Sequence, residues 1–242
     1  MTDMIKDQGG PTSTPEEAEF ELRAHLGAVW TGGRLFIGMY TFILASLAFS
    51  YFYLRSSNNA QLWRPHHVTA PTYYGFFIYA FLLITAGMAL YGQWRLRRGG
   101  VVDWQVAGWT GVGSGLLALF LQIWEFQKVP FYPGSSGYAS TFIGFAVINI
   151  ATIVVGTYWL ETTLARASRL RREIGGVDPV LSQHPSAQSL RANIASMTYF
   201  WGFVALASTL FLFMFYLSMV IESCAEGSPR TGREEGQRVG SR

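Results

Sequence analysis

The stretch GYASTFIGFAVINIATIVVG, residues 137–156, decides the fold class of this 242-residue chain, because it is apolar almost throughout. Its polar exceptions are Asn149 near the middle and Thr152 three residues on. A hydrocarbon core about 30 Å thick is crossed by roughly 20 helical residues at about 1.5 Å each. The stretch therefore predicts a transmembrane helix that carries an amide, and a buried amide needs a hydrogen-bonding partner.

Four further blocks have the same apolar character. Half of all residues are hydrophobic and 14% are charged, whereas roughly a quarter are charged in an ordinary soluble domain. The blocks do not alternate with period two, and an open sheet cannot satisfy its backbone in lipid, so membrane-spanning strands are excluded. We expect an all-α, polytopic membrane protein, a bundle of five transmembrane helices at residues 35–53, 74–92, 106–126, 141–164 and 199–221.

The first 34 residues are polar and acidic, and they do not have the basic start and short apolar core of a cleavable signal peptide. Thr14, Pro15 and Glu17 match an N-cap, a first-turn proline and a capping-box acid. We therefore expect residues 1–34 to be a cytoplasmic segment with a short amphipathic helix over residues 15–30. Gly32 and Gly33 are expected to end that helix.

Basic residues divide unevenly between the two sides of the predicted membrane, which predicts the orientation. The side that carries the N-terminus holds Lys6, Arg23, Arg34, Arg95, Arg97, Arg98, Arg166, Arg169, Arg171, Arg172 and Arg191, and the opposite connections hold Arg55, Arg64 and Lys128. The N-terminus is therefore expected in the cytoplasm and the C-terminus outside. Residues 222–242, rich in Gly, Arg, Glu and Ser, are expected to form a disordered external tail.

Histidine and cysteine bear on whether the chain has a redox centre of its own. His25, His66, His67 and His184 all lie outside the predicted spans, so histidines cannot build an intramembrane haem or copper site. His66 and His67 either touch a metal at the outer surface or face water, and the second interpretation is favoured. The single cysteine, Cys224, excludes an intramolecular disulfide and a multi-thiolate metal site. We expect no cofactor and no metal in this chain.

Ionisable residues inside the predicted spans are Glu125, near the outer end of the third, and Glu161, near the inner end of the fourth. They form no relay across the membrane, and the broken helices typical of secondary transporters are missing from the sequence pattern. The arginines are dispersed over the loops without a nucleic-acid-reading motif, so no nucleic acid partner is expected. Gly108, Gly111 and Gly115 in the third span predict a close helix contact.

Several stretches, in order and with matching spacing, resemble subunit III of the haem-copper (cytochrome c) oxidases, in its short five-helix form. LQIWEF, residues 121–126, is similar to the Q-x-x-E-aromatic motif of that family at Gln122 and Glu125. LWRPHH, in the first outer loop, resembles the family's Trp-Pro-Pro at Trp63 and Pro65. The resemblance covers about residues 35–221.

The later helices show both matches and departures. YFWGFV resembles the family's Tyr-Trp-His-Phe-Val-Asp and places Trp201 in register. Asn149 and Thr152 stand where the family has two histidines. Tyr40 occupies the position of a glutamate that is usual in the family, Gly202 that of a histidine, and Ala205 that of an aspartate. The chain thus resembles a divergent member. Asn149 is expected to join helices through a hydrogen bond, with a lipid or ligand contact as the alternative.

The resemblance implies an accessory subunit in a bacterial cytoplasmic membrane, in contact with lipids and with a catalytic subunit I-like partner that carries haem and copper. Relatives also accompany nitric oxide reductases, so the electron acceptor could be oxygen or nitric oxide. A free-standing transporter is the alternative from another class. For Glu125 two interpretations remain: a structured anchor at the outer end of the bundle, which the matching Gln122 favours, or a side chain that reaches water beside Lys128.

Overall fold

The computed structural model describes residues 14–58, 60–65, 70–173 and 180–217, which form helices joined by short connections and contain no strand. Five of the helices are long and apolar enough to cross a membrane, so the predicted all-α fold with five spans is confirmed. The expectations for His66, His67, Cys224 and residues 222–242 concern positions outside the described residues. The elements are α1 (Pro15–Ser57), α2 (Ala60–Trp63), α3 (Thr72–Arg97), α4 (Val101–Lys128), α5 (Gly137–Glu173), α6 (Pro185–Leu212) and the π-helical turn η1 (Phe213–Leu217).

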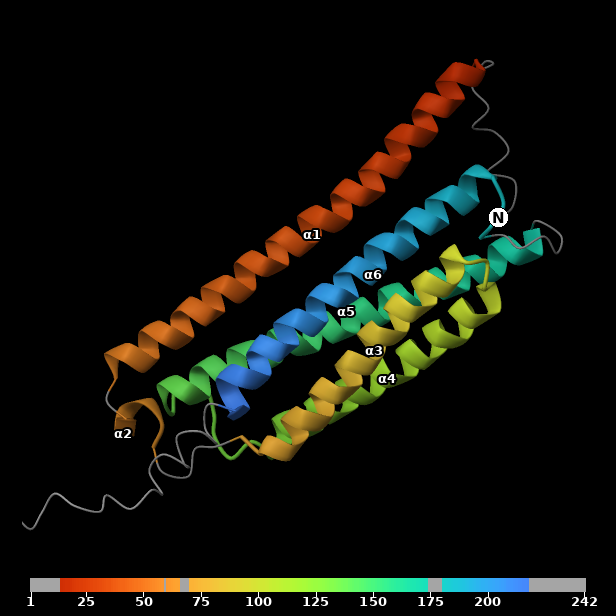
Figure 1. Ribbon diagram of the computed structural model, residues 1–242. Coiled ribbons are helices and arrows are strands. Elements are labelled where there is room, and N and C mark those ends of the chain that lie inside the picture. Colours follow the sequence, from red (N-terminus) through yellow and green to blue (C-terminus); the bar gives the residue numbers. More distant parts are fainter. Residues whose placement is uncertain (1–13, 59, 66–69, 174–179, 218–242) are drawn as a thin grey trace, which may run out of the picture.

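Four of the long helices form a ring, and the fifth lies along its edge (Figure 1). In the ring, α3 contacts α4 and α6, and α5 contacts the same two helices. Helix α1 packs against α5 and α6. Only 11% of the most apolar part of α1 is buried, against 39–44% in the other four spans. Most of the surface of α1 is therefore open to lipid or to another protein.

Helix α1 begins as predicted but does not end where predicted. The Thr14 side chain accepts a hydrogen bond from the Glu17 amide, and the Glu17 carboxylate accepts one from the Thr14 amide, which confirms the capping box. The expected end at Gly32 and Gly33 is wrong, because α1 continues to Ser57. A Cβ atom at Gly33 would lie 1.9 Å from Ser196 Oγ of α6. The glycine therefore permits a close approach of two helices.

The other helices also extend past their apolar blocks. α5 runs to Glu173 and α6 begins at Pro185, so most of the long connection expected after residue 164 is helical. The arginines of this region, among them Arg166 and Arg169, lie on α5. Leu170 and Leu190 are buried where the two extensions meet. The length of an apolar block predicts only the part of a helix that lipid surrounds. Packing against a neighbouring helix extends the helix beyond that part.

The predicted glycine contact on α4 is confirmed, and its partner is α5. A Cβ atom at Gly108 would lie 2.6 Å from Leu164 Cδ2, and one at Gly115 would lie 2.6 Å from Thr157 Oγ1. These separations are shorter than any van der Waals contact, so the glycines set the distance between the helices. The stripe consists of Gly108, Gly111 and Gly115.

Candidate functional site

The most polar part of the interior surrounds Glu125, whose side chain is completely buried. Gln122 Nε2 donates to Glu125 Oε2 over 2.8 Å, and Tyr216 Oη donates to Glu125 Oε1 over 2.7 Å. Gln122 and Glu125 are three residues apart and so share one face of α4. Tyr216 reaches the same carboxyl from η1, so both carboxyl oxygens have a partner.

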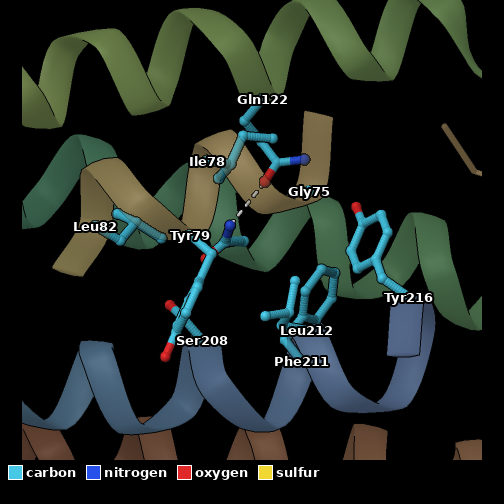
Figure 2. A pocket seen from close by; sticks show the side chains of 10 residues that line it. Gly75, Ile78, Tyr79, Leu82, Gln122, Ser208, Phe211, Leu212 and Tyr216 are labelled. Carbon is cyan, nitrogen blue, oxygen red and sulfur yellow. Dashed lines mark hydrogen bonds between the residues drawn. The ribbon is translucent and has the colours of Figure 1, made fainter. Parts of the chain in front are cut away.

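Asn149 extends this arrangement to a further helix. Its Nδ2 atom donates to Gln122 Oε1 over 2.7 Å, which joins α5 to α4 (Figure 2). The interhelical hydrogen bond expected of Asn149 is therefore present. We call the buried side chains Gln122, Glu125 and Tyr216, together with the half-buried Asn149, the buried polar cluster. The cluster links α5, α4 and η1. Such a bond between membrane helices contributes about 0.6 kcal/mol on average and up to about 1.7 kcal/mol.

The position of the Glu125 side chain decides between its two interpretations, a structured anchor and a side chain that reaches water. Lys128 Nζ lies over the ring of the exposed Trp124, 5.6 Å from its centroid, and the Glu125 carboxyl faces the interior. The interpretation in which Glu125 reaches water beside Lys128 is wrong. Its two hydrogen-bond partners in the described part of the chain are both uncharged. Packing of η1 over α4 closes the site, and sequence spacing within α4 cannot reveal this.

The π-helical turn η1 places Tyr216 in the cluster. Tyr51 Oη of α1 donates to the Met214 carbonyl over 2.8 Å and so holds the turn to α1. On α3, a Cβ atom at Gly75 would lie 2.5 Å from the Tyr216 ring, so the phenol packs directly on the backbone of that glycine. A π-helical turn shifts the helical phase by about one residue, and such turns are frequent at functional sites.

Thr152 lies one turn from Asn149 but has a different neighbour. Its hydroxyl is hydrogen-bonded to that of Tyr40 on α1 over 2.5 Å, and it also donates to the Ile148 carbonyl. The two side chains at the positions of the family's histidines therefore contact different helices. Asn149 joins α5 to α4, and Thr152 joins α5 to α1.

The remaining predicted residues pack helices and lie outside the buried polar cluster. Trp63 ends α2 and is buried against α5, where a Cβ atom at Gly137 would lie 2.9 Å from its ring. Pro65 follows and is half-buried. Trp201 of α6 is fully buried, and a Cβ atom at Gly156 of α5 would lie 2.9 Å from it. The structure brings Gln122, Glu125 and Asn149 together, but leaves Trp63, Pro65, Thr152 and Trp201 outside the cluster.

Tyr216 is the member of the cluster that sequence reasoning missed. It is a phenol inside an apolar block, and its contact with Glu125 joins residues 91 positions apart. Helical periodicity could not have indicated this contact, because η1 departs from the α-helical phase. Within residues 14–58, 60–65, 70–173 and 180–217, no group of three or more His, Cys, Asp or Glu side chains is arranged to hold a metal ion.

Among known proteins, neither a family model nor a curated sequence matches this chain. The resemblance to oxidase subunit III therefore depends on the motif residues and their spacing. What the structure does establish is a helical protein with five apolar helices, as expected of a multi-pass membrane protein.

Proposed function

We propose that the chain is an accessory, subunit III-like component of a bacterial haem-copper respiratory oxidase, which supports the catalytic subunit without a redox centre of its own. The observation that carries this proposal is the hydrogen bond between Asn149 and Gln122. It joins Gln122, in the family-like stretch LQIWEF on α4, to a position of α5 at which the family has a histidine. A residue that carries the resemblance thus forms a contact between helices, as expected of a scaffolding subunit.

In this proposal haem and copper belong to a subunit I-like partner, and lipid covers the remaining apolar surface. In this proposal the end of the bundle at which α1 begins faces the cytoplasm. The proposal is supported by the Arg-rich ends of α3 and α5, which lie at the same end of the bundle as the N-terminal ends of α1 and α6 (Figure 1). Helix α1 offers the largest uncovered face for such contacts. Its exposed large side chains include Leu35, Met39, Phe42, Phe49 and Phe52.

Purification of the full chain from its native membrane in a mild detergent tests the proposal. We expect the chain to migrate in native gels with a larger polypeptide that shows a haem absorption spectrum. Separation of the two should leave all of the haem on the larger polypeptide. Migration of the chain alone, or haem that stays with the separated chain, would contradict the proposal.

The same preparation distinguishes the alternatives. A catalytic partner that consumes nitric oxide in place of oxygen would make the chain an accessory of a nitric oxide reductase. A free-standing transporter would purify without a haem-bearing partner, and it would move a solute when reconstituted alone in vesicles. In that case Asn149, Thr152 and Glu125 would be the residues to test along the transport path.

A further inference from the structure

A cavity adjoins the buried polar cluster in the centre of the four-helix ring. It lies between α3, α4, α5 and α6. Its polar lining includes Gln122, Asn149, Ser208 and Tyr216. Figure 2 shows side chains from α3, α4, α6 and η1 around it. An empty cavity inside a membrane protein is expected to be apolar, whereas this one has amide and hydroxyl groups on its walls.

The size and lining of this cavity fit about one water molecule. The volume that the centre of a water molecule can reach is about 10 Å³, close to the space that one buried water needs. A buried water also needs two to four polar partners. The Asn149 amide uses one of its two N–H groups on Gln122, which leaves hydrogen-bonding capacity beside the Ser208 hydroxyl.

A second cavity lies on the α1 side of the same side chains. It has about 30 Å³ of space for water between α1, α5 and α6, and its lining includes Tyr40 and Phe145. Asn149, Ser208 and Phe211 line both cavities and so lie between them. The lining of the first cavity also includes Tyr216, whose hydroxyl is bonded to Glu125.

The surroundings of Glu125 favour the neutral acid. An ionised carboxyl without a cationic partner is costly to bury, by several kcal/mol. Gln122 on α4, Asn149 on α5 and Gly75 on α3 bring no charge to the site. Within the described residues, the titratable groups nearby are the phenols of Tyr216 on η1 and Tyr138 on α5. The positive charge of Arg64 acts on the Tyr138 phenol.

We propose that Glu125 is a proton-binding group, protonated at rest, and that it exchanges its proton through the Tyr216 hydroxyl and a water molecule held by Asn149 and Ser208. In the protonated state the Glu125 hydroxyl donates to the Tyr216 oxygen, which reverses the direction of the hydrogen bond that the ionised carboxylate accepts from the phenol. On release, the carboxyl passes its proton to the phenol oxygen while the phenol passes its own proton to the water. The products are a carboxylate, an unchanged phenol and a hydronium ion. This inference does not depend on the oxidase proposal, because it concerns groups of this chain alone.

Infrared spectroscopy of the full chain, with glutamate labelled by carbon-13, tests the protonation. We expect a carbonyl band of a protonated carboxylic acid at neutral pH that shifts with the label and disappears in Glu125→Gln. The other glutamates whose side chains the structure describes are exposed, and the loss of the band in Glu125→Gln distinguishes the buried carboxyl from them: Glu16, Glu17, Glu19, Glu21, Glu161 and Glu173. A spectrum without a label-sensitive band of this kind would overturn the proposal, and this result does not require the variant to fold.

The rate at which this band shifts after transfer into D₂O tests the route. Ser208→Leu fills the space beside Asn149 that the proposed water occupies, and we expect several-fold slower exchange, with a smaller effect in Ser208→Val. The matched control is Ser114→Ala, because Ser114 is also buried but bonds to Thr85 and the Gly111 carbonyl, away from both cavities. Exchange as fast in both Ser208 variants as in the control would show that the proton does not pass through a water beside Ser208.

Discussion

Replacement of Gly115 by alanine tests the packing of α4 on α5 most directly. The added Cβ atom would lie 2.6 Å from Thr157 Oγ1 and 3.5 Å from Thr157 Cγ2. Thr157 is β-branched and has few alternative rotamers in a helix, so the helices must separate. Overpacking of this kind costs about 1–3 kcal/mol, from which up to about 1 kcal/mol is recovered through the higher helix propensity of alanine.

Thr157 itself allows a second step in the same test. Its hydroxyl is buried and has no hydrogen-bond partner within the described residues. Thr157→Ala removes both the group that clashes and an unsatisfied polar atom. We therefore expect Gly115→Ala combined with Thr157→Ala to be more stable than Gly115→Ala alone, with a coupling of about 0.5–3 kcal/mol between the two sites.

The free energy of unfolding in mild detergent, measured by titration with a denaturing detergent, gives these values. Gly113→Ala is the matched control, because the same substitution two residues away meets no atom within 4 Å. Its expected effect is neutral or slightly stabilising. If Gly115→Ala is as stable as Gly113→Ala, or if Thr157→Ala does not relieve it, then the glycine stripe does not set the distance between α4 and α5.

Two further substitutions test contacts between other helices. Asn149→Leu removes the hydrogen bond to Gln122 and should lower the free energy of unfolding by about 0.5–2 kcal/mol, without a change in the haem spectrum of the proposed complex; a spectral change with assembly intact would contradict the structural role. Gly33→Ala places a Cβ atom 1.9 Å from Ser196 Oγ and should weaken the contact of α1 with α6 by about 1–3 kcal/mol. Gly32→Ala, which meets open space, is its control, and equal thermal stability of these two variants would refute the proposed contact.

Within the candidate site, the sequence identified the polar residues but did not predict which residues surround them. Gln122, Glu125 and Asn149 stood out because polar side chains in apolar blocks are costly and therefore need partners. Their mutual hydrogen bonds depend on the rotation of α4 relative to α5, which no spacing within one helix specifies. The burial of Glu125 depends on η1, which approaches from a segment 91 positions away.

What the sequence alone determined is the number of membrane-spanning helices, because hydrocarbon thickness sets a minimum apolar length that can be counted along the chain. The start of α1 was also determined locally, by a capping box that involves four consecutive residues. Tertiary structure alone decided that α1 passes through its glycine pair, that the stripe on α4 faces α5, and that Tyr216 completes the buried polar cluster. These features arise from contacts between helices, and such contacts depend on shape and rotation, which apolar length does not encode.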